Sequence, residues 1–312
     1  MAEQTLETPT EDIEQLDEPP RNGARADTGA RDEDEFTGNF HVYEPYRVGL
    51  PPLGPYFREL RRRREFALTL SRTKLRAKHF DTAFGQLWMV LTPLLMACVY
   101  FMLVMVIRGG SRGIEFFAHL TAALFLFQLF STSVREATNS IVGGGRLILN
   151  TAFPRVLLPL SSVVGGFRRF LPTVPVLLVI HVIAGVAFGW AMLLAVPIAG
   201  LVVLIAAGFA CLVAATQVYF RDLSGFMPHV LRIWLYSTPI LYTAEQASDN
   251  GLGFLMWLNP MAPLIRSWSS VMDHQELPDA TVFAAGAAWA VFFFVVGILF
   301  FISRERELAV RI

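Results

Sequence analysis

Uncharged apolar stretches long enough to cross a lipid bilayer make up most of this sequence after residue 85. Residues 85–107 contain 23 consecutive residues without Asp, Glu, Lys or Arg, residues 171–190 contain 20, and residues 192–220 contain 29. About 20 predominantly apolar residues span a hydrocarbon core of roughly 30 Å. Because these stretches are too long and too numerous for the buried helices of a soluble domain, the sequence predicts an all-α, polytopic membrane protein.

Six transmembrane helices are expected. The expected spans are residues 85–107, residues 117–134, a third span ending near residue 190, and residues 192–214, 226–242 and 282–302. Basic residues favour the cytosolic side of a membrane, and ten Lys and Arg between residues 47 and 78 precede the first span. Further arginines follow the second, fourth and sixth spans. We therefore expect a multi-pass protein of the cytoplasmic membrane with both termini in the cytosol.

The part of the chain before the first span divides by charge. The first 35 residues contain 12 Asp or Glu and 3 Arg, too little apolar surface to offset the entropy of ordering, so residues 1–40 are expected to be a disordered acidic cytosolic tail. Residues 41–84 are basic, with Phe57, Leu60 and Leu68 at helical spacing. This pattern predicts an amphipathic helix in the headgroup layer, with arginines reaching lipid phosphates; a solvated linker is the alternative. The transmembrane domain would then cover residues 85–303, and residues 304–312 would form a cytosolic tail.

Two segments interrupt the pattern of simple spans. Residues 253–271 are apolar, but Asn259, Pro260 and Pro263 break the run, which predicts re-entrant helices on the outer side, buried against protein. Arg168 and Arg169 precede the apolar stretch of the third span. An arginine inside a membrane costs about 2.5–3.5 kcal/mol on insertion scales and usually faces a cavity or a partner. We expect both to face the cytosolic mouth of a substrate path and to bind a lipid pyrophosphate; anchoring at the headgroups is the alternative.

Patterns typical of catalysis are absent from the sequence. Residues 143–146 lack the GxxxxGK[ST] spacing of a phosphate-binding loop, and neither HExxH, CxxC nor GxSxG occurs. The six histidines are scattered, with no pair at metal-ligand spacing. No catalytic residue, no metal site and no bound cofactor is therefore expected. A membrane-embedded polyprenyl-lipid transferase would need paired carboxylates, and an ion-coupled transporter would need inverted repeats and intramembrane acids; neither pattern is visible.

Several short motifs occur together from about residue 51 to the C-terminus. They are Leu75-Arg76 through Gly85, Trp88 and Pro93, LFLFQ at 124–128, NSIV at 139–142, Leu147-Ile148, Phe153-Pro154-Arg155, VYFRD at 218–222, TPI at 238–240 and LNPM at 258–261. In this order and spacing they resemble the permeases of ABC-2-type exporters, and most closely the polysaccharide-exporting branch.

This resemblance implies a function and a set of partners. Permeases of this branch export O-antigen, teichoic acid or cell-wall galactan on a polyprenyl pyrophosphate lipid. They work as two membrane subunits with two separate ATPase subunits, which use ATP and Mg. The chain would therefore be a transporter subunit and not an enzyme. The 24 Arg against 2 Lys suggest a GC-rich, actinobacterial source, for which a galactan is the expected cargo. An ABC-2 permease for a drug or another lipid is the alternative.

Two groups of candidate site residues follow. Resemblance to the coupling helix of the family implies that residues 145–155 contact the ATPase, with Phe153 as an apolar plug and Pro154 breaking the chain before the third helix; an ordinary cytosolic loop is the alternative. Arg221 and Asp222 would form a second contact or an internal pair. The coupling candidates are Arg146, Leu147, Phe153, Pro154, Arg155, Arg221 and Asp222.

The second group would line the substrate path. Sugar rings stack on aromatic faces, and Trp and Tyr combine an apolar body with a polar tip. The candidates are Trp88, Tyr100, Trp234 and Tyr236, together with Arg168 and Arg169. The same amphipathic character also favours the interfacial belt of a membrane protein, which is the alternative.

Overall fold

The structure, a computed structural model, describes residues 53–79, 85–108, 113–151, 153–186, 188–242, 253–308 and 311. All of them lie in one compact unit, Val48–Ile312. Within these ranges the chain forms helices and no strand, which confirms the expected all-α class. The acidic tail expected over residues 1–40 and the first part of the basic segment lie outside the described residues.

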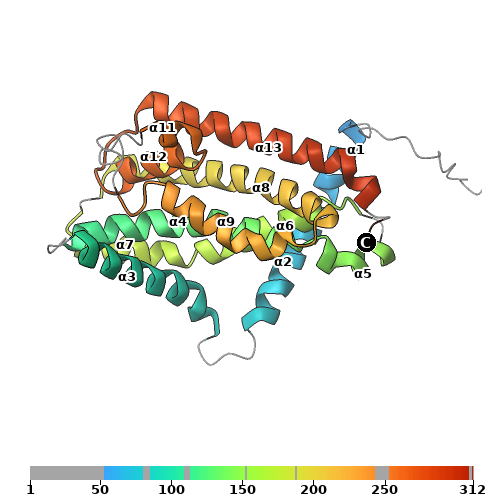
Figure 1. The fold of residues 1–312 in the computed structure, drawn as a ribbon, viewed down its shortest axis with the longest axis horizontal. Coiled ribbons are helices and arrows are strands. Elements are labelled where there is room, and N and C mark those ends of the chain that lie inside the picture. Colours follow the sequence, from blue (N-terminus) through green and yellow to red (C-terminus); the bar gives the residue numbers. More distant parts are fainter. Residues whose placement is uncertain are drawn as a thin grey trace, which may run out of the picture. The chain divides into compact units, whose positions relative to one another are not determined.

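Twelve α-helices are described, and Figure 1 shows their arrangement. They are α1 (Leu53–Arg62), α2 (Arg64–His79), α3 (Trp88–Arg108), α4 (Ile114–Thr138), α5 (Gly145–Asn150), α6 (Leu157–Phe170), α7 (Thr173–Ile183), α8 (Ala195–Tyr219), α9 (Leu223–Ser237), α11 (Gly253–Leu258), α12 (Ala262–Met272) and α13 (Ala280–Leu308). Short 3-10 turns η1 (Gly85–Leu87), η2 (Val142–Gly144) and η3 (Trp190–Leu194) precede α3, α5 and α8.

Five helical segments are long and apolar enough to cross a membrane. They are Trp88–Ile107, Ile114–Thr138, Leu157–Ile183, Trp190–Tyr219 and Ala280–Leu308. The third combines α6 and α7, which are separated at Leu171 and Pro172, and the fourth combines η3 and α8. These five correspond to the first four expected spans and the last one.

The expected fifth span, residues 226–242, corresponds to α9, which has 15 residues. At 1.5 Å per residue α9 is about 23 Å long, shorter than a hydrocarbon core of about 30 Å. The helix ends where Thr238 adopts an extended conformation (φ −94°, ψ 142°). Because Thr238 precedes Pro239, the proline ring disfavours the helical conformation at this position.

The basic segment before the first span is helical where it is described. Its two helices, α1 and α2, meet at Arg63, and α2 packs against α6. Phe57 and Leu68 are exposed, whereas Leu60 is half-buried. The expected amphipathic helix is thus two consecutive helices in the structure.

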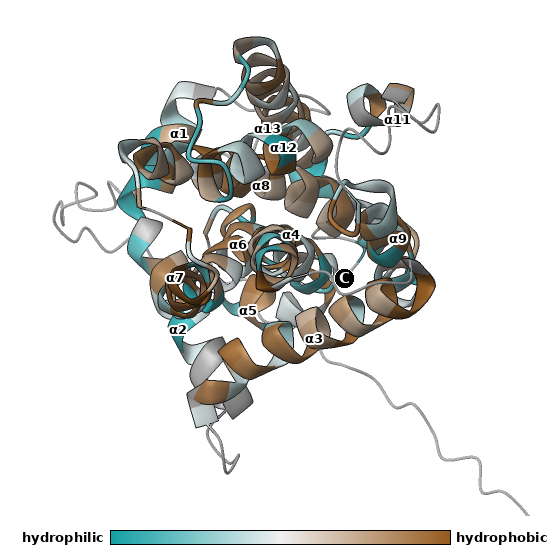
Figure 2. Ribbon diagram, turned by 90° about the vertical axis from the view of Figure 1, so that its left-hand side faces the viewer, coloured by the Kyte–Doolittle hydropathy of each residue, from teal (hydrophilic) through white to brown (hydrophobic). Residues whose placement is uncertain are grey.

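Helix α4 occupies the centre of the described unit. Figure 2 shows it surrounded by α3, α6, α7, α8 and α9, and it packs against all five. Its side chains Phe125, Phe127 and Phe130 are fully buried. Phe130 and Phe209 of α8 both contact the Trp234 ring of α9 edge to face, at centroid distances of 5.0 and 4.9 Å. Aromatic packing therefore joins three helices around one point.

Glycines allow the closest helix contacts. A Cβ atom at Gly208 of α8 would overlap the Phe293 carbonyl of α13, and one at Gly297 of α13 would overlap the Gly208 carbonyl. A Cβ at Gly166 of α6 would likewise overlap the Ser133 hydroxyl of α4. Small residues at such crossings let backbones approach closely, which is how helices associate when both are surrounded by lipid.

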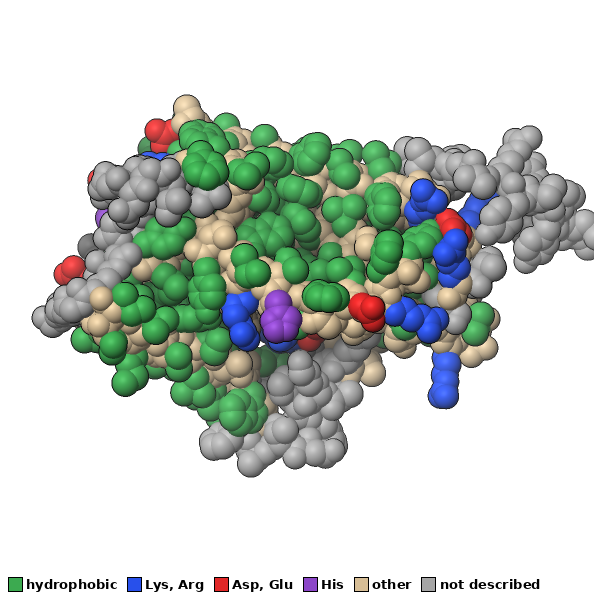
Figure 3. All heavy atoms as spheres, viewed as in Figure 1, with side chains coloured by type: hydrophobic (Ala, Val, Ile, Leu, Met, Phe, Trp, Pro, Cys, Tyr) green, Lys and Arg blue, Asp and Glu red, His purple; other side chains and the backbone are tan. Residues whose placement is uncertain are grey.

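The two ends of the helix bundle differ in character. At one end, here called the α5 end, α8 and α13 finish and α5 and α6 begin; α12 and the end of α7 lie at the opposite, α12 end (Figure 1). Figure 3 shows hydrophobic side chains over most of the visible face between the ends, whereas most of the visible Arg side chains gather toward the α5 end. The middle of the bundle therefore has the apolar surface expected of a protein surrounded by lipid.

Candidate functional site

The segment expected to contact an ATPase, residues 145–155, lies at the α5 end. Its first part is α5, a helix of six residues whose Ile148 packs into a buried cluster with Val156 and Leu158. Leu149, one residue further, is 73% exposed, and Arg146 is also exposed. The outer face of α5 therefore presents an apolar and a cationic side chain together.

Glu305, near the end of α13, holds this segment in place. Its Oε1 accepts a hydrogen bond from the Arg155 backbone N–H at 2.5 Å, and its carbonyl oxygen accepts one from Arg155 Nη1 at 2.6 Å. Its Oε2 accepts a hydrogen bond from the Tyr56 hydroxyl of α1 at 2.7 Å. Burial, and then the Glu305 carboxylate, raise the pKa of Tyr56, so this hydroxyl remains a donor. Glu305 thus joins α1, the segment 145–155 and α13.

A cavity of about 560 Å³ opens beside this junction, lined by Leu149, Phe153, Arg155 and Glu305 among others. Phe153 is half-buried, because its ring packs on Phe66 of α2 at a centroid distance of 4.8 Å. Leu149, which was not among the candidates selected from the sequence, is a more exposed apolar side chain of this segment than Phe153. The role of Phe153 as an apolar plug stays a prediction. Pro154 is buried and precedes α6, whose first turn closes with the Leu157 N–H donating to the Pro154 carbonyl at 3.1 Å.

Arg221 and Asp222 lie in the exposed turn between α8 and α9. No ion pair joins the two within the described ranges, so the internal pair considered from the sequence is absent from the structure. The turn is held instead by Gln217, whose Nε2 donates to the Arg221 carbonyl at 2.7 Å and to Asn139 Oδ1 at 3.3 Å.

The four aromatic candidates for the substrate path and Arg169 lie in three places. Trp88 and Arg169 line a cavity of about 140 Å³ between α3, α4, α6 and α7. Tyr100 of α3 and Tyr236 of α9 meet edge to face at 6.2 Å; Tyr100 is buried, whereas Tyr236 is 45% exposed. Trp234 points into the aromatic core around Phe130. The structure therefore brings together only pairs of these residues.

The neighbouring arginines Arg168 and Arg169 point to different partners. Arg169 forms an ion pair with Glu136 of α4. Arg168 donates from Nη1 to the Leu68 carbonyl of α2 at 3.2 Å and does not line the cavity. Of the two arginines, only Arg169 lies where it can contact a group in the cavity.

Asn259, expected in a re-entrant element, is the centre of a hydrogen-bond network. Its Oδ1 accepts from Trp234 Nε1 at 2.8 Å and from the Met261 N–H at 3.0 Å, while its Nδ2 donates to the Thr238 hydroxyl at 2.9 Å. Asn259 and Pro260 are both buried and connect α11 to α12. This network explains why Trp234 turns inward: its indole N–H finds a partner there.

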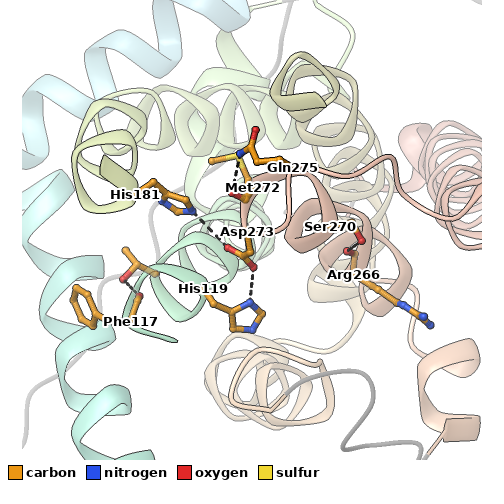
Figure 4. Close-up of polar contacts among 9 residues, drawn as sticks. Phe117, His119, His181, Arg266, Ser270, Met272, Asp273 and Gln275 are labelled. Atoms are coloured by element: carbon orange, nitrogen blue, oxygen red, sulfur yellow. Dashed lines mark hydrogen bonds and ion pairs between the residues drawn. The ribbon is translucent and has the colours of Figure 1, made fainter. Parts of the chain in front are cut away.

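A second polar cluster at the α12 end was not expected from the sequence. Asp273, which follows α12, lies between His119 of α4 and His181 of α7, as Figure 4 shows. Its Oδ2 lies 2.6 Å from His119 Nδ1, and its Oδ1 lies 3.5 Å from His181 Nε2. Burial raises the pKa of Asp273, but the hydrogen bonds and charges of the two histidines outweigh this effect and hold it below the ordinary value. Among the described residues, no group of His, Cys, Asp and Glu is arranged to hold a metal ion.

Fold and composition together define a multi-pass helical membrane protein. No protein-family model matches the chain. Among characterised proteins it is similar to the O-antigen export system permease protein RfbA of Myxococcus xanthus, with 32% identity over 258 residues, which are 81% of this chain and 97% of the relative. Two Klebsiella pneumoniae proteins of the same name are 28% identical over 206 and 215 residues, covering 65% and 68% of this chain and 78% and 82% of the relatives.

This similarity extends over nearly the whole length of the Myxococcus relative. The chain therefore belongs to the family of ABC-2-type O-antigen export permeases.

Proposed function

We propose that this chain is the membrane subunit of an ATP-driven exporter that moves a polyprenyl-pyrophosphate-linked polysaccharide across the cytoplasmic membrane. Its family membership supports the export of a polysaccharide. A glycan of the O-antigen, teichoic acid or galactan type is the proposed cargo. Two copies of the chain work with two separate ATPase subunits, which bind ATP and Mg; the permease itself binds no cofactor.

The proposed topology has six crossings. Helix α9 and residues 238–242 together form one crossing, which brings the five candidate spans to six. Helices α11 and α12 are re-entrant on the outer side, where Asn259 and Asp273 tie them to neighbouring helices. With six crossings both termini lie in the cytosol, and the α5 end, where basic side chains gather (Figure 3), is the cytosolic end.

The observation that carries the proposal is the Glu305 junction. An exporter without its own nucleotide site needs a mechanical link between the ATPase and its spans. A force on α5 reaches α13 through the two hydrogen bonds between Arg155 and Glu305, and reaches α1 through Tyr56. Arg155 also lies two residues before Leu157, the first residue of α6, so the same force moves the third span. We propose that Leu149 and Arg146 contact the ATPase and that the Glu305 junction distributes its movement.

The cargo requires a protein-lined path. A glycan cannot cross hydrocarbon, because each unsatisfied hydroxyl costs several kcal/mol there. The exposed Tyr236 ring, supported edge-on by Tyr100, offers an aromatic face and a hydroxyl at the surface between α3 and α9. We propose that this surface faces a second copy of the chain and that the glycan passes between the copies.

Purification of the tagged chain from its native membranes in a mild detergent tests this function. An ABC ATPase should co-purify in equal amount, and depletion of the chain should cause a lipid-linked glycan to accumulate on the cytosolic side. A chain that purifies without an ATPase, or depletion that leaves every lipid-linked glycan unchanged, would contradict the proposal.

A further inference from the structure

The cavity between α3, α4, α6 and α7 contains more charge than a structural void would. Trp88 and Thr92 of α3, Gln128 and Arg135 of α4, and Arg169 of α6 line it. Its volume of about 140 Å³ is far above the roughly 10–15 Å³ that a single water needs. Of its lining residues, Arg135 and Thr92 are exposed, whereas Phe125 and Phe170 are buried. The cavity is therefore lined both by residues at the surface and by residues of the core.

The two arginines of this cavity differ in how their charge is balanced. Arg169 pairs with Glu136, but its Nε is buried and has no hydrogen-bond partner among the described residues. In the part of the chain that the structure describes, no carboxylate pairs with Arg135. Arg135 and Arg169 are the charged side chains among the described residues that line the cavity, and Glu136, which pairs with Arg169 beside it, carries one carboxylate. These three groups together have a net charge of +1.

Neutral donors at the cavity are also available to a ligand. The hydroxyls of Thr121, Ser133 and Thr138 on α4 each donate to the carbonyl four residues earlier. Thr132, which lines the cavity, makes no such bond among the described residues, and neither does the side-chain amide of Gln128. Buried polar groups are normally hydrogen-bonded. A ligand with several acceptor oxygens would satisfy Thr132, Gln128 and the Arg169 Nε together.

We infer that this cavity binds the pyrophosphate group of the lipid-linked cargo, with Arg135 as the primary contact. Guanidinium groups bind phosphate oxygens bidentately with charge-assisted hydrogen bonds. Arg169, held by Glu136, is a secondary donor through its Nε. Trp88 at the rim provides an aromatic surface for the group attached to the pyrophosphate. The inference deepens the proposed function and rests on it, because it places the lipid headgroup at one site of the proposed path.

Three variants of the full-length chain in nanodiscs of zwitterionic phosphatidylcholine test the inference. Native mass spectrometry would measure binding of a synthetic polyprenyl pyrophosphate, with inorganic pyrophosphate as competitor and phosphatidylglycerol as the comparison lipid. Arg135→Gln should weaken binding of the polyprenyl pyrophosphate about tenfold, equivalent to about 1.4 kcal/mol. Glu136→Gln should strengthen it several-fold, because Arg169 then lacks its competing carboxylate. Arg168→Gln removes the same charge from the adjacent residue outside the cavity and should leave binding unchanged.

Arg135→Gln and Glu136→Gln are expected to change binding in opposite directions, which separates an effect on binding from an effect on folding. If the Glu136–Arg169 pair served only to hold the fold, Glu136→Gln would weaken binding as well. Competition by inorganic pyrophosphate supports recognition of the anion itself. Equal effects of Arg135→Gln and Arg168→Gln would overturn the inference. A phosphatidylglycerol affinity that equals that of the polyprenyl pyrophosphate, and falls equally with Arg135→Gln, would also overturn it in favour of a general lipid contact. Co-purification with the ATPase does not depend on Arg135, so the proposed function can stand if this inference fails.

Discussion

Removing the Glu305 carboxylate should release the segment 145–155 from α13. Glu305→Ala deletes the hydrogen bonds from the Arg155 N–H and the Tyr56 hydroxyl, whereas the bond from Arg155 Nη1 to the Glu305 carbonyl can persist. A hydrogen bond to a charged group contributes about 1.5–3 kcal/mol to stability. Because the junction borders an open cavity, water can replace part of each lost bond, and we expect a local loss of about 2–3 kcal/mol for the two together.

Hydrogen exchange measures this loss directly. The Arg155 amide donates to the deleted carboxylate, so a loss of 2–3 kcal/mol should speed its exchange by about 30- to 150-fold if it exchanges by local opening. Export should fall while the ATPase still co-purifies, because Leu149 and Arg146 remain exposed. Glu307→Ala is the matched control, because among the described residues the polar partners of Glu307 are Tyr219, Arg304 and Arg311, none of which belongs to the segment 145–155. Unchanged exchange at Arg155 in Glu305→Ala would refute the reasoning.

Three further outcomes are expected. Gly208→Val should destabilise the protein by about 1–3 kcal/mol, because the new side chain overlaps the α13 backbone. Gly200→Val should not, because a Cβ atom at Gly200 meets no atom within 4 Å. Thermal unfolding in detergent compares the two variants, and equal midpoints would contradict this helix packing. Asn259→Ala should cost about 1–3 kcal/mol in the same assay, because the Trp234 indole N–H loses its acceptor; an unchanged midpoint would count against this network. The pKa of Asp273 is lowered in the folded protein, so its stabilisation is complete above its ordinary pKa of 3.8 and is lost as pH falls through the folded pKa. Asp273→Asn should remove this part of the acid destabilisation, and an unchanged acid transition would contradict the cluster.

The helical class and most spans were predictable because long apolar runs have few other stable folds in a membrane. The end of α9 was not predictable in this way: hydropathy predicted a span over residues 226–242, whereas the backbone restriction before Pro239 ends the helix itself at Ser237. Hydropathy averages over residues, whereas a proline acts at one position. The sequence also marked Asn259 and Pro260 as an interruption without showing that Asn259 would bond Trp234.

Contacts between distant residues account for what the sequence analysis missed. Glu305 is 150 residues from Arg155 and 249 from Tyr56, so no local pattern connects them. His119 and His181 looked unrelated because α4 and α7 meet only in the folded chain, where Asp273 lies between them. Arg168 and Arg169 were treated as one pair, but adjacent residues on a helix point about 100° apart, and only Arg169 reaches the cavity. Phe153 is less exposed than Leu149 because its ring packs on Phe66 of α2, a contact that the sequence could not show.

Crosslinking from the exposed tip of α5 tests the central claim most directly. A photoreactive amino acid replacing Leu149, in the full-length chain in native membranes, should crosslink to an ABC ATPase subunit. The same amino acid replacing Leu277, an exposed residue between α12 and α13, should not, because it lies at the α12 end. A Leu149 crosslink to an ATPase that is absent at Leu277 is the predicted result; no ATPase crosslink from Leu149, or equal crosslinking from both ends, would contradict the account.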